Sequence, residues 1–120
     1  MSYRYYNANA LGKFVNDCVI RSIALVEHNT WDYTYDKLSE LAQEQGTLLD
    51  DVDFVENYLD KRYPRTCHYS KTVEEFMEEF PKGTYLVTME GHITPIIDGV
   101  LYDTFDCRNQ RMWCSWRIKD

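Results

Sequence analysis

Cys18, His92 and Asp103 are residues whose types could together carry out nucleophilic chemistry. In a thiol hydrolase, the imidazole takes the proton of the thiol or pairs with the thiolate, and the carboxylate fixes the tautomer of the imidazole. Backbone N–H groups at a helix start hold the negative oxygen that develops on the substrate. The prediction therefore depends on whether the elements that carry these residues bring them together.

Cys18 lies in the first turn of a predicted helix, residues 16–26, which is apolar on nearly every side and is expected to be buried. Asn16 or Asp17 can cap its start by accepting hydrogen bonds from the free N–H groups of the first turn. A thiol in that turn feels the positive end of the helix dipole, which favours the thiolate. The alternative role of Cys18 is that of a small packed side chain.

His92 belongs to the stretch "GHITPIIDGVLYDTFD", residues 91–106, which reads as a hairpin. Asp98-Gly99 is a dipeptide that favours a two-residue turn, so Ile97 should pair with Val100. Side chains alternate between the two faces of a hairpin with period two. One face should therefore carry His92, Thr94, Ile96, Leu101, Asp103 and Phe105.

The register of this hairpin selects one of its three acids. His92 and Asp103 become diagonal neighbours whose side chains can reach each other, whereas Asp98 sits in the turn and Asp106 faces the opposite side. A histidine satisfied by a backbone carbonyl and a strand-end acid are the alternative roles of these two residues. Their agreement in register, together with Cys18, favours a catalytic triad.

Further helices are predicted by apolar spacing, capping signals and stop signals at residues 31–46, 50–63 and 72–80. In the second of these, Val52, Val55 and Leu59 should form one apolar stripe. In the third, Thr72 and Glu75 have the spacing of a capping box.

The character of the chain then changes to strand-like segments at residues 83–90, 92–97, 100–105 and 112–118. Helices followed by strands predict an α+β fold, with N-terminal helices packed on a mostly antiparallel C-terminal sheet, in a single domain spanning residues 1–120. Pro95 cannot donate a ladder hydrogen bond, so it should face an unpaired edge or a bulge.

Composition bounds the class of partner. The chain has 120 residues, 44% of them hydrophobic, and a formal net charge of −7, which disfavours nucleic acid and anionic membrane as partners. No apolar run is long enough to cross a bilayer, and the N-terminus lacks the apolar core of a signal peptide. A cytoplasmic protein is therefore expected. No cofactor is predicted.

The other cysteines are Cys67, Cys107 and Cys114. In a reducing cytosol all three are expected to be free, buried or half-buried thiols. Their spacing lacks the short pairs typical of structural zinc sites, so no metal is predicted.

Several segments also resemble a family of small bacteriophage and bacterial proteins with a papain-like core, akin to bacteriocin-processing cysteine peptidases. The resemblance runs from about residue 9 to 116 and rests on "NDCVIRSIA", "TWDYTYDKLSELA", "TVEEF", "PKGTYLVTMEGH" and "DGVLYDTFDC". It implies a minimal papain-like fold in which Cys18, His92 and Asp103 are the triad.

The resemblance has a gap at the oxyanion donor. Papain-like enzymes usually carry a glutamine several residues before the cysteine, whereas this chain has Gly12 there and no glutamine before Gln43. Asn16, or more remotely Asn7 or Asn9, offers an amide donor of the same kind. The alternative role of Asn16 is to cap the helix that begins near Cys18.

The expected activity is hydrolysis of amide or isopeptide bonds in a protein substrate, through a thioester acyl-enzyme at Cys18. A phage-encoded enzyme of this kind would act in the host cytosol, on a host protein. The same triad also supports glutamine deamidation and transglutamination. A non-catalytic alternative is a phage protein that blocks a host factor through its tyrosine-rich N-terminus, Trp113 and Trp116, because aromatic residues are enriched at interfaces.

Overall fold

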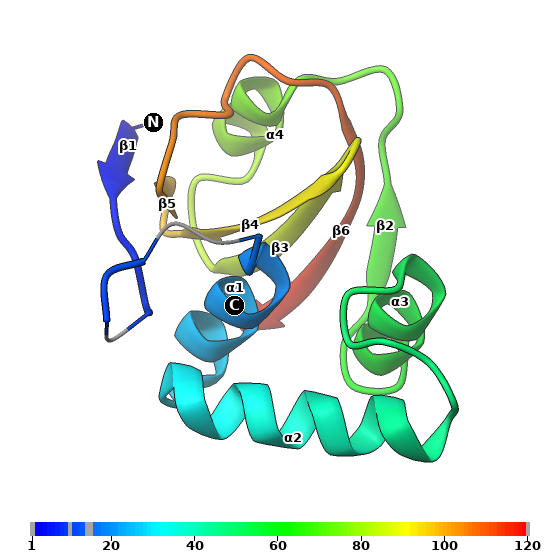
Figure 1. Ribbon diagram of the computed structural model, residues 1–120. Helices are drawn as coiled ribbons and strands as arrows, with labels where there is room; N and C mark the ends of the chain where they lie inside the picture. The colour runs from blue at the N-terminus through cyan, green and yellow to red at the C-terminus, as the bar shows by residue number, and fades with distance from the viewer. Residues whose placement is uncertain (1, 10, 14–15, 120) are drawn as a thin grey trace.

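In the computed structural model, which describes residues 2–9, 11–13 and 16–119, the strands form one six-stranded sheet in the order β1-β5-β4-β3-β6-β2 (Figure 1). The strands are β1 Ser2–Tyr5, β2 Arg65–Cys67, β3 Thr84–Met89, β4 His92–Ile97, β5 Val100–Asp103 and β6 Met112–Lys119. β1 runs parallel to β5, and the other neighbours are antiparallel. The predicted sheet thus gains two edge strands, β1 and β2, that sequence patterns did not indicate.

The helices of the described chain are α1 Cys18–Glu27, α2 Trp31–Glu44, α3 Val52–Asp60 and α4 Val73–Glu79. α1 packs on β4 and against α2 (Figure 1). The capping box predicted for α4 is confirmed, because Thr72 and Glu75 exchange both of its hydrogen bonds. The α+β class is also confirmed.

Two hydrophobic clusters follow from the alternation of side chains along the strands. Leu86, Ile93 and Trp116 join the cluster built with α1, α2 and α3. Val87 and Ile96 join the other cluster, which includes α4. Both faces of the sheet are therefore covered by helices.

The β4–β5 hairpin has the predicted turn and register. Asp98 and Gly99 both have positive φ angles, 49° and 75°, as a type I′ turn requires. Ile96 pairs with Leu101 and Ile97 with Val100. The carboxylate of Asp98 also accepts a hydrogen bond of 2.9 Å from the backbone N–H of Gly83, which confirms that this acid serves the turn.

Pro95 lies in an interior strand, contrary to the expectation of a sheet edge. It pairs with Leu86 of β3, while the ladder between β4 and β5 ends at Ile96. The ladder between β4 and β5 thus stops at Ile96, the residue that follows the proline in the chain, and does not need the missing N–H.

The apolar stripe predicted for residues 50–63 is wrong at its first position. Val55 and Leu59 are buried, but 57% of Val52 is exposed. Phe54 and Tyr58 of α3 are buried in its place, which turns the helix so that Val52 faces outward.

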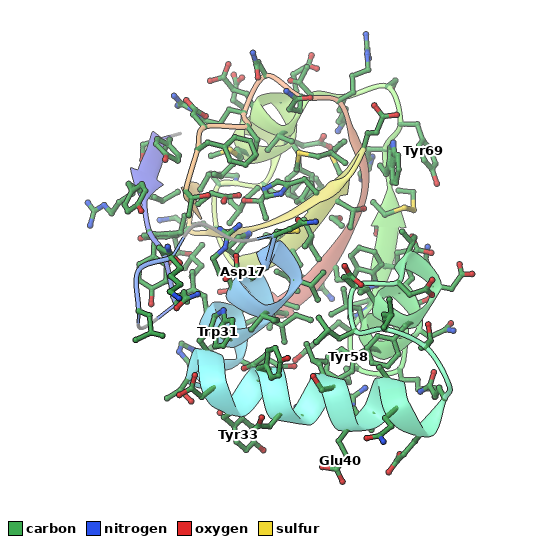
Figure 2. All side chains as sticks on the ribbon, viewed as in Figure 1. Asp17, Trp31, Tyr33, Glu40, Tyr58 and Tyr69 are labelled. Atoms are coloured by element: carbon green, nitrogen blue, oxygen red, sulfur yellow. A yellow bond between two sulfur atoms is a disulfide. The ribbon has the colours of Figure 1, made fainter. Side chains whose placement is uncertain are left out.

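Cys67 and Cys114 form a disulfide, so the prediction of free thiols is wrong for this pair. They are directly opposed in the antiparallel register of β2 and β6. Figure 2 shows the yellow sulfur–sulfur bond near Tyr69. The sequence did not predict this disulfide because it did not predict β2, the strand that carries Cys67. Cys107 is free and buried, as expected.

Of the helices in the described part of the chain, none has the length and apolar character needed to cross a membrane.

Candidate active site

His92 and Asp103 are joined by a short hydrogen bond between side chains. Nε2 of His92 lies 2.6 Å from Oδ2 of Asp103, although the regular ladder between their strands ends several residues away. The rings of His92 and Phe105, which the register also paired, have centroids 4.8 Å apart. The predicted face of the hairpin is therefore confirmed through its side chains.

The carboxylate of Asp103 is fully buried and accepts several hydrogen bonds. Besides His92, it accepts from Thr94 Oγ1 at 2.8 Å, from Arg21 Nη1 at 2.9 Å and from the backbone N–H of Thr104 at 2.7 Å. A buried charge needs such partners, because desolvation is costly. The same partners fix the direction in which the carboxylate meets the imidazole.

The electrostatics of the pair favour an imidazolium facing a carboxylate. Burial lowers the pKa of His92, but hydrogen bonding with Asp103, Cys107 and Cys18, in that order, outweighs it and raises the pKa to about 11. Burial also raises the pKa of Asp103, but hydrogen bonds from His92 and Arg21 bring it below the usual value for an aspartate. At neutral pH His92 is therefore protonated.

Cys18 is the first residue of α1, so its predicted place in the first turn is confirmed. Its side chain is a half-buried free thiol that lines the same two surface hollows as His92. Nε2 of the His92 ring is directed at Asp103, which leaves Nδ1 as the ring atom available to a thiol. The structure thus brings together all three residues that the sequence selected.

Asp17 is the N-cap residue of α1, but its side chain does not accept the predicted capping hydrogen bond from the first turn. Its carboxylate instead accepts hydrogen bonds from Arg21 Nε at 2.7 Å and from the indole of Trp31 at 2.8 Å. Figure 2 shows Asp17 and Trp31 where α1 meets α2. Asp17 therefore orients Arg21, which in turn donates to Asp103. The N–H groups at the start of α1 receive no hydrogen bond from the Asp17 side chain.

Two hollows meet at Cys18 and His92, and both residues line each of them. The first, of about 280 Å³, is called the apolar hollow here because its walls include Leu49, Val52, Val55, Ile93 and Trp113. The second, of about 390 Å³, is called the polar hollow; its walls include Arg21, Glu90, Thr104, Phe105 and Gln110. An extended ligand could run from one hollow to the other across the thiol.

Asn16 remains the candidate oxyanion donor among the asparagines. It is exposed beside Cys18 and lines both hollows. The Asn7 side chain donates to the backbone oxygen of Lys13, and Asn9 accepts from the backbone N–H of Leu11, so both are engaged within their own loop.

Gln110 is a second amide near the thiol that sequence reasoning missed. It lines the polar hollow together with Cys18, although it follows the cysteine in the chain by a long interval. Gln110 lies downstream of Cys18, whereas the glutamine of papain-like enzymes precedes the cysteine.

Cys107, which sequence reasoning treated as an ordinary thiol, lies within 4.8 Å of ligand atoms of both His92 and Asp103. These three residue types can ligate a metal. However, Asp103 already accepts hydrogen bonds from four groups, one of them the cation Arg21, and its 2.6 Å bond to His92 is a hydrogen-bond distance. The hydrogen bonds made by His92 and Asp103 therefore fit a hydrogen-bonded network better than a metal centre.

Comparisons with protein-family models, with curated proteins and with solved structures find no match for this chain. The geometry of Cys18, His92 and Asp103 is therefore the basis for a functional proposal.

Proposed function

We propose that the protein is a cysteine hydrolase that cleaves amide or isopeptide bonds in a protein or peptide substrate. The observation that carries the proposal is the 2.6 Å contact of His92 with Asp103, beside a half-buried free thiol at the start of a helix. Nucleophile, base and orienting acid are the three roles that such chemistry needs.

In the first step, Cys18 reacts as a thiolate paired with the His92 imidazolium: its sulfur attacks the carbonyl carbon of the substrate and a C–S bond forms. His92, which is protonated at neutral pH, donates its proton to the leaving nitrogen, and the C–N bond breaks. The amine product departs and a thioester remains on Cys18. The backbone N–H groups at the start of α1 are suited to hold the transient oxyanion.

In the second step, water attacks the thioester carbonyl while His92 takes a proton from it. The C–S bond breaks, the carboxylic acid product leaves, and the thiolate–imidazolium pair is restored. Asp103 keeps the imidazole in one orientation throughout, because the carboxylate is itself fixed by Arg21 and Thr94.

A minimal papain-like arrangement is part of the proposal. The chain order supports it: a cysteine begins a helix, a histidine begins a later strand, and an acid ends the strand after that. The observed architecture is a mixed sheet with helices on both faces. The proposed arrangement would be built on this sheet.

The decisive experiment is alkylation by a trace of iodoacetamide at pH 7, followed by peptide mapping without reduction. The free thiols Cys18 and Cys107 are the competing sites. We expect Cys18 to react first and His92→Asn to abolish this preference. His28→Asn is the matched control, because His28 is exposed and asparagine tolerates its left-handed backbone. If Cys18 reacts no faster than a free thiol in a short peptide, the proposal is wrong.

A further inference from the structure

The two sulfurs of the Cys67–Cys114 disulfide have different surroundings. Cys67 belongs to β2, an edge strand whose three residues are all exposed, whereas Cys114 is 1% exposed in the interior strand β6. In thiol–disulfide exchange, a thiolate attacks one sulfur of the bridge and the other sulfur leaves as a thiolate. Access therefore favours attack on Cys67, which makes Cys114 the leaving group.

Tyr69 is placed to assist this leaving group. Its hydroxyl lies 3.6 Å from Sγ of Cys114, and Figure 2 labels the tyrosine beside the bridge. A disulfide sulfur carries no hydrogen, so the phenol is the donor in this contact. Such a hydrogen bond becomes stronger as negative charge develops on the sulfur. The contact thus favours release of Cys114 as the thiolate.

Cys114 is held in place independently of the bridge. Its backbone N–H donates to Oγ1 of Thr88 at 3.2 Å, and the same hydroxyl donates to the backbone oxygen of Cys114 at 3.3 Å. Just after β2, the backbone N–H of His68 donates to the backbone oxygen of Trp113 at 2.8 Å, which tethers the edge strand to β6. The two sulfurs should therefore stay within reach of each other after the bridge opens.

We propose that Cys67 is a site of reversible S-thiolation by low-molecular-weight thiols. The incoming thiolate forms an S–S bond with Cys67, and the bond between Cys67 and Cys114 breaks. The electron pair of that bond stays on Cys114, which takes a proton from water. The site does not involve Cys18, so this inference is independent of the proposed hydrolase.

The mixed disulfide at Cys67 has two fates. Attack by the Cys114 thiolate on Cys67 expels the small thiolate and restores the bridge. Attack by a second small thiolate on the sulfur of the first releases a small-molecule disulfide and leaves Cys67 as a thiolate. In the second case the protein bridge gains two electrons and two protons, and two small thiols are oxidised.

The Cys18→Ala variant tests the proposal, because its remaining free thiol in the described chain, Cys107, is buried. Reduced glutathione is added at mildly alkaline pH, samples are quenched in acid, and peptic peptides are mapped without reduction. We expect the glutathione adduct on Cys67 to exceed that on Cys114 by at least about tenfold, because burial shields the second sulfur.

Two further variants in the Cys18→Ala background isolate each sulfur. With Cys114→Ala, nothing can expel the small thiol, so oxidised glutathione should leave a lasting adduct on Cys67. Cys67→Ala is the matched control, in which the buried Cys114 should react at least about tenfold more slowly. These rates need no intact bridge and so test access to the two sulfurs alone.

Tyr69→Phe tests the leaving group. Opening of the bridge by glutathione should slow about two- to tenfold, because one hydrogen bond to the departing sulfur is lost. Tyr33→Phe, at a tyrosine of similar exposure on α2, should leave the rate unchanged. Tyr69→Phe should also leave the labelling of Cys67 in Cys114→Ala unchanged, because glutathione is then the leaving group.

An adduct mainly on Cys114 would overturn the inference. So would a bridge that glutathione leaves intact while dithiothreitol opens it. Equal opening rates in Tyr69→Phe and Tyr33→Phe would show that Tyr69 does not assist the departing sulfur. Because Cys18 is absent from every sample, these results leave the proposed hydrolase to its own alkylation test.

Discussion

Arg21 donates a hydrogen bond of 2.9 Å to Asp103, 82 positions further along the chain. Arg21 lies one turn after Cys18 in α1, and Asp103 ends β5. One helix thus carries both the proposed nucleophile and the cation that fixes the proposed catalytic acid. Any movement of α1 relative to the hairpin would therefore disturb both ends of the proposed triad together.

Arg21→Met should destabilise the fold strongly. The side chains of Arg21 and Asp103 are 10% and 1% exposed. Removal of Arg21 leaves the buried carboxylate of Asp17 without its cation and leaves Asp103 with His92 alone as its charged partner among the described residues. We expect a loss of about 3–5 kcal/mol in the free energy of unfolding, measured by urea denaturation. Arg108→Met, which removes an exposed ion pair with Asp106, should cost less than about 1 kcal/mol. Equal losses in the two variants would show that Arg21 has no special role.

Asp103→Asn should slow formation of the acyl-enzyme. Asparagine cannot stabilise the imidazolium of His92, and it can favour the wrong tautomer. The burst of nitrophenolate from p-nitrophenyl acetate should fall in rate by about 10²–10⁴-fold. Asp98→Asn is the control in the same hairpin, since asparagine also adopts the positive φ of that turn residue. A burst that survives in Asp103→Asn would remove Asp103 from the triad.

The stability of the protein should depend on pH through His92. Its pKa is about 11 in the folded chain, against 6.5 for an ordinary histidine. A raised pKa contributes stability that is fully present below pH 6.5 and is lost as the pH rises through 11. The difference in unfolding free energy between wild type and His92→Gln should therefore shrink between pH 6.5 and 10, by up to about 1.4 kcal/mol per pH unit. A difference that stays constant over this range would contradict the raised pKa.

The oxyanion donor can be separated from the nucleophile with two reagents. Acylation by an ester passes through an oxyanion, whereas alkylation by iodoacetamide does not. If Asn16 is the donor, Asn16→Ala should slow acylation by about 10²–10³-fold and leave alkylation of Cys18 unchanged. The same pattern in Gln110→Ala would assign the role to Gln110 instead, because both amides line the polar hollow. If neither variant slows acylation, no side-chain amide at these positions serves the oxyanion.

Reduction of the Cys67–Cys114 disulfide should destabilise the protein without abolishing the site. The bridge joins residues 47 positions apart. In the chain-entropy model, closing a loop of this length raises the free energy of unfolding by about 4 kcal/mol, and measured stabilisations are typically about 2–4 kcal/mol. Urea denaturation with and without reductant measures the loss. The Cys67→Ala/Cys114→Val double variant is the control and should not respond to reductant. If reductant lowers the free energy of unfolding of this double variant by the same amount, the loss does not come from the Cys67–Cys114 disulfide.

The hairpin shows how far local sequence can lead. Asp98-Gly99 specifies the turn, and the turn sets the register, so the residue pattern alone is enough to pair His92 with Asp103. The position of Cys18 at a helix start is predictable for the same reason, because capping and apolar patterns act over a few residues.

Other parts of the site depend on contacts between distant segments. Asp17 has the sequence position of a helix cap, but its carboxylate pairs with Arg21 and Trp31 instead, which only the packing of α1 against α2 makes possible. β1 and β2 are short edge strands stabilised by β5 and β6, and their own residues show no clear pattern. The disulfide follows from one of these unpredicted pairings.

The sequence by itself thus determined the types of the three residues of the proposed triad and the pairing of two of them. These depend on turn chemistry and on strand alternation, which are local. Only the tertiary structure decided that Cys18 and His92 line the same two hollows and that Arg21 holds Asp103. These relationships depend on how α1 lies across β4, and packing of the whole core decides that placement.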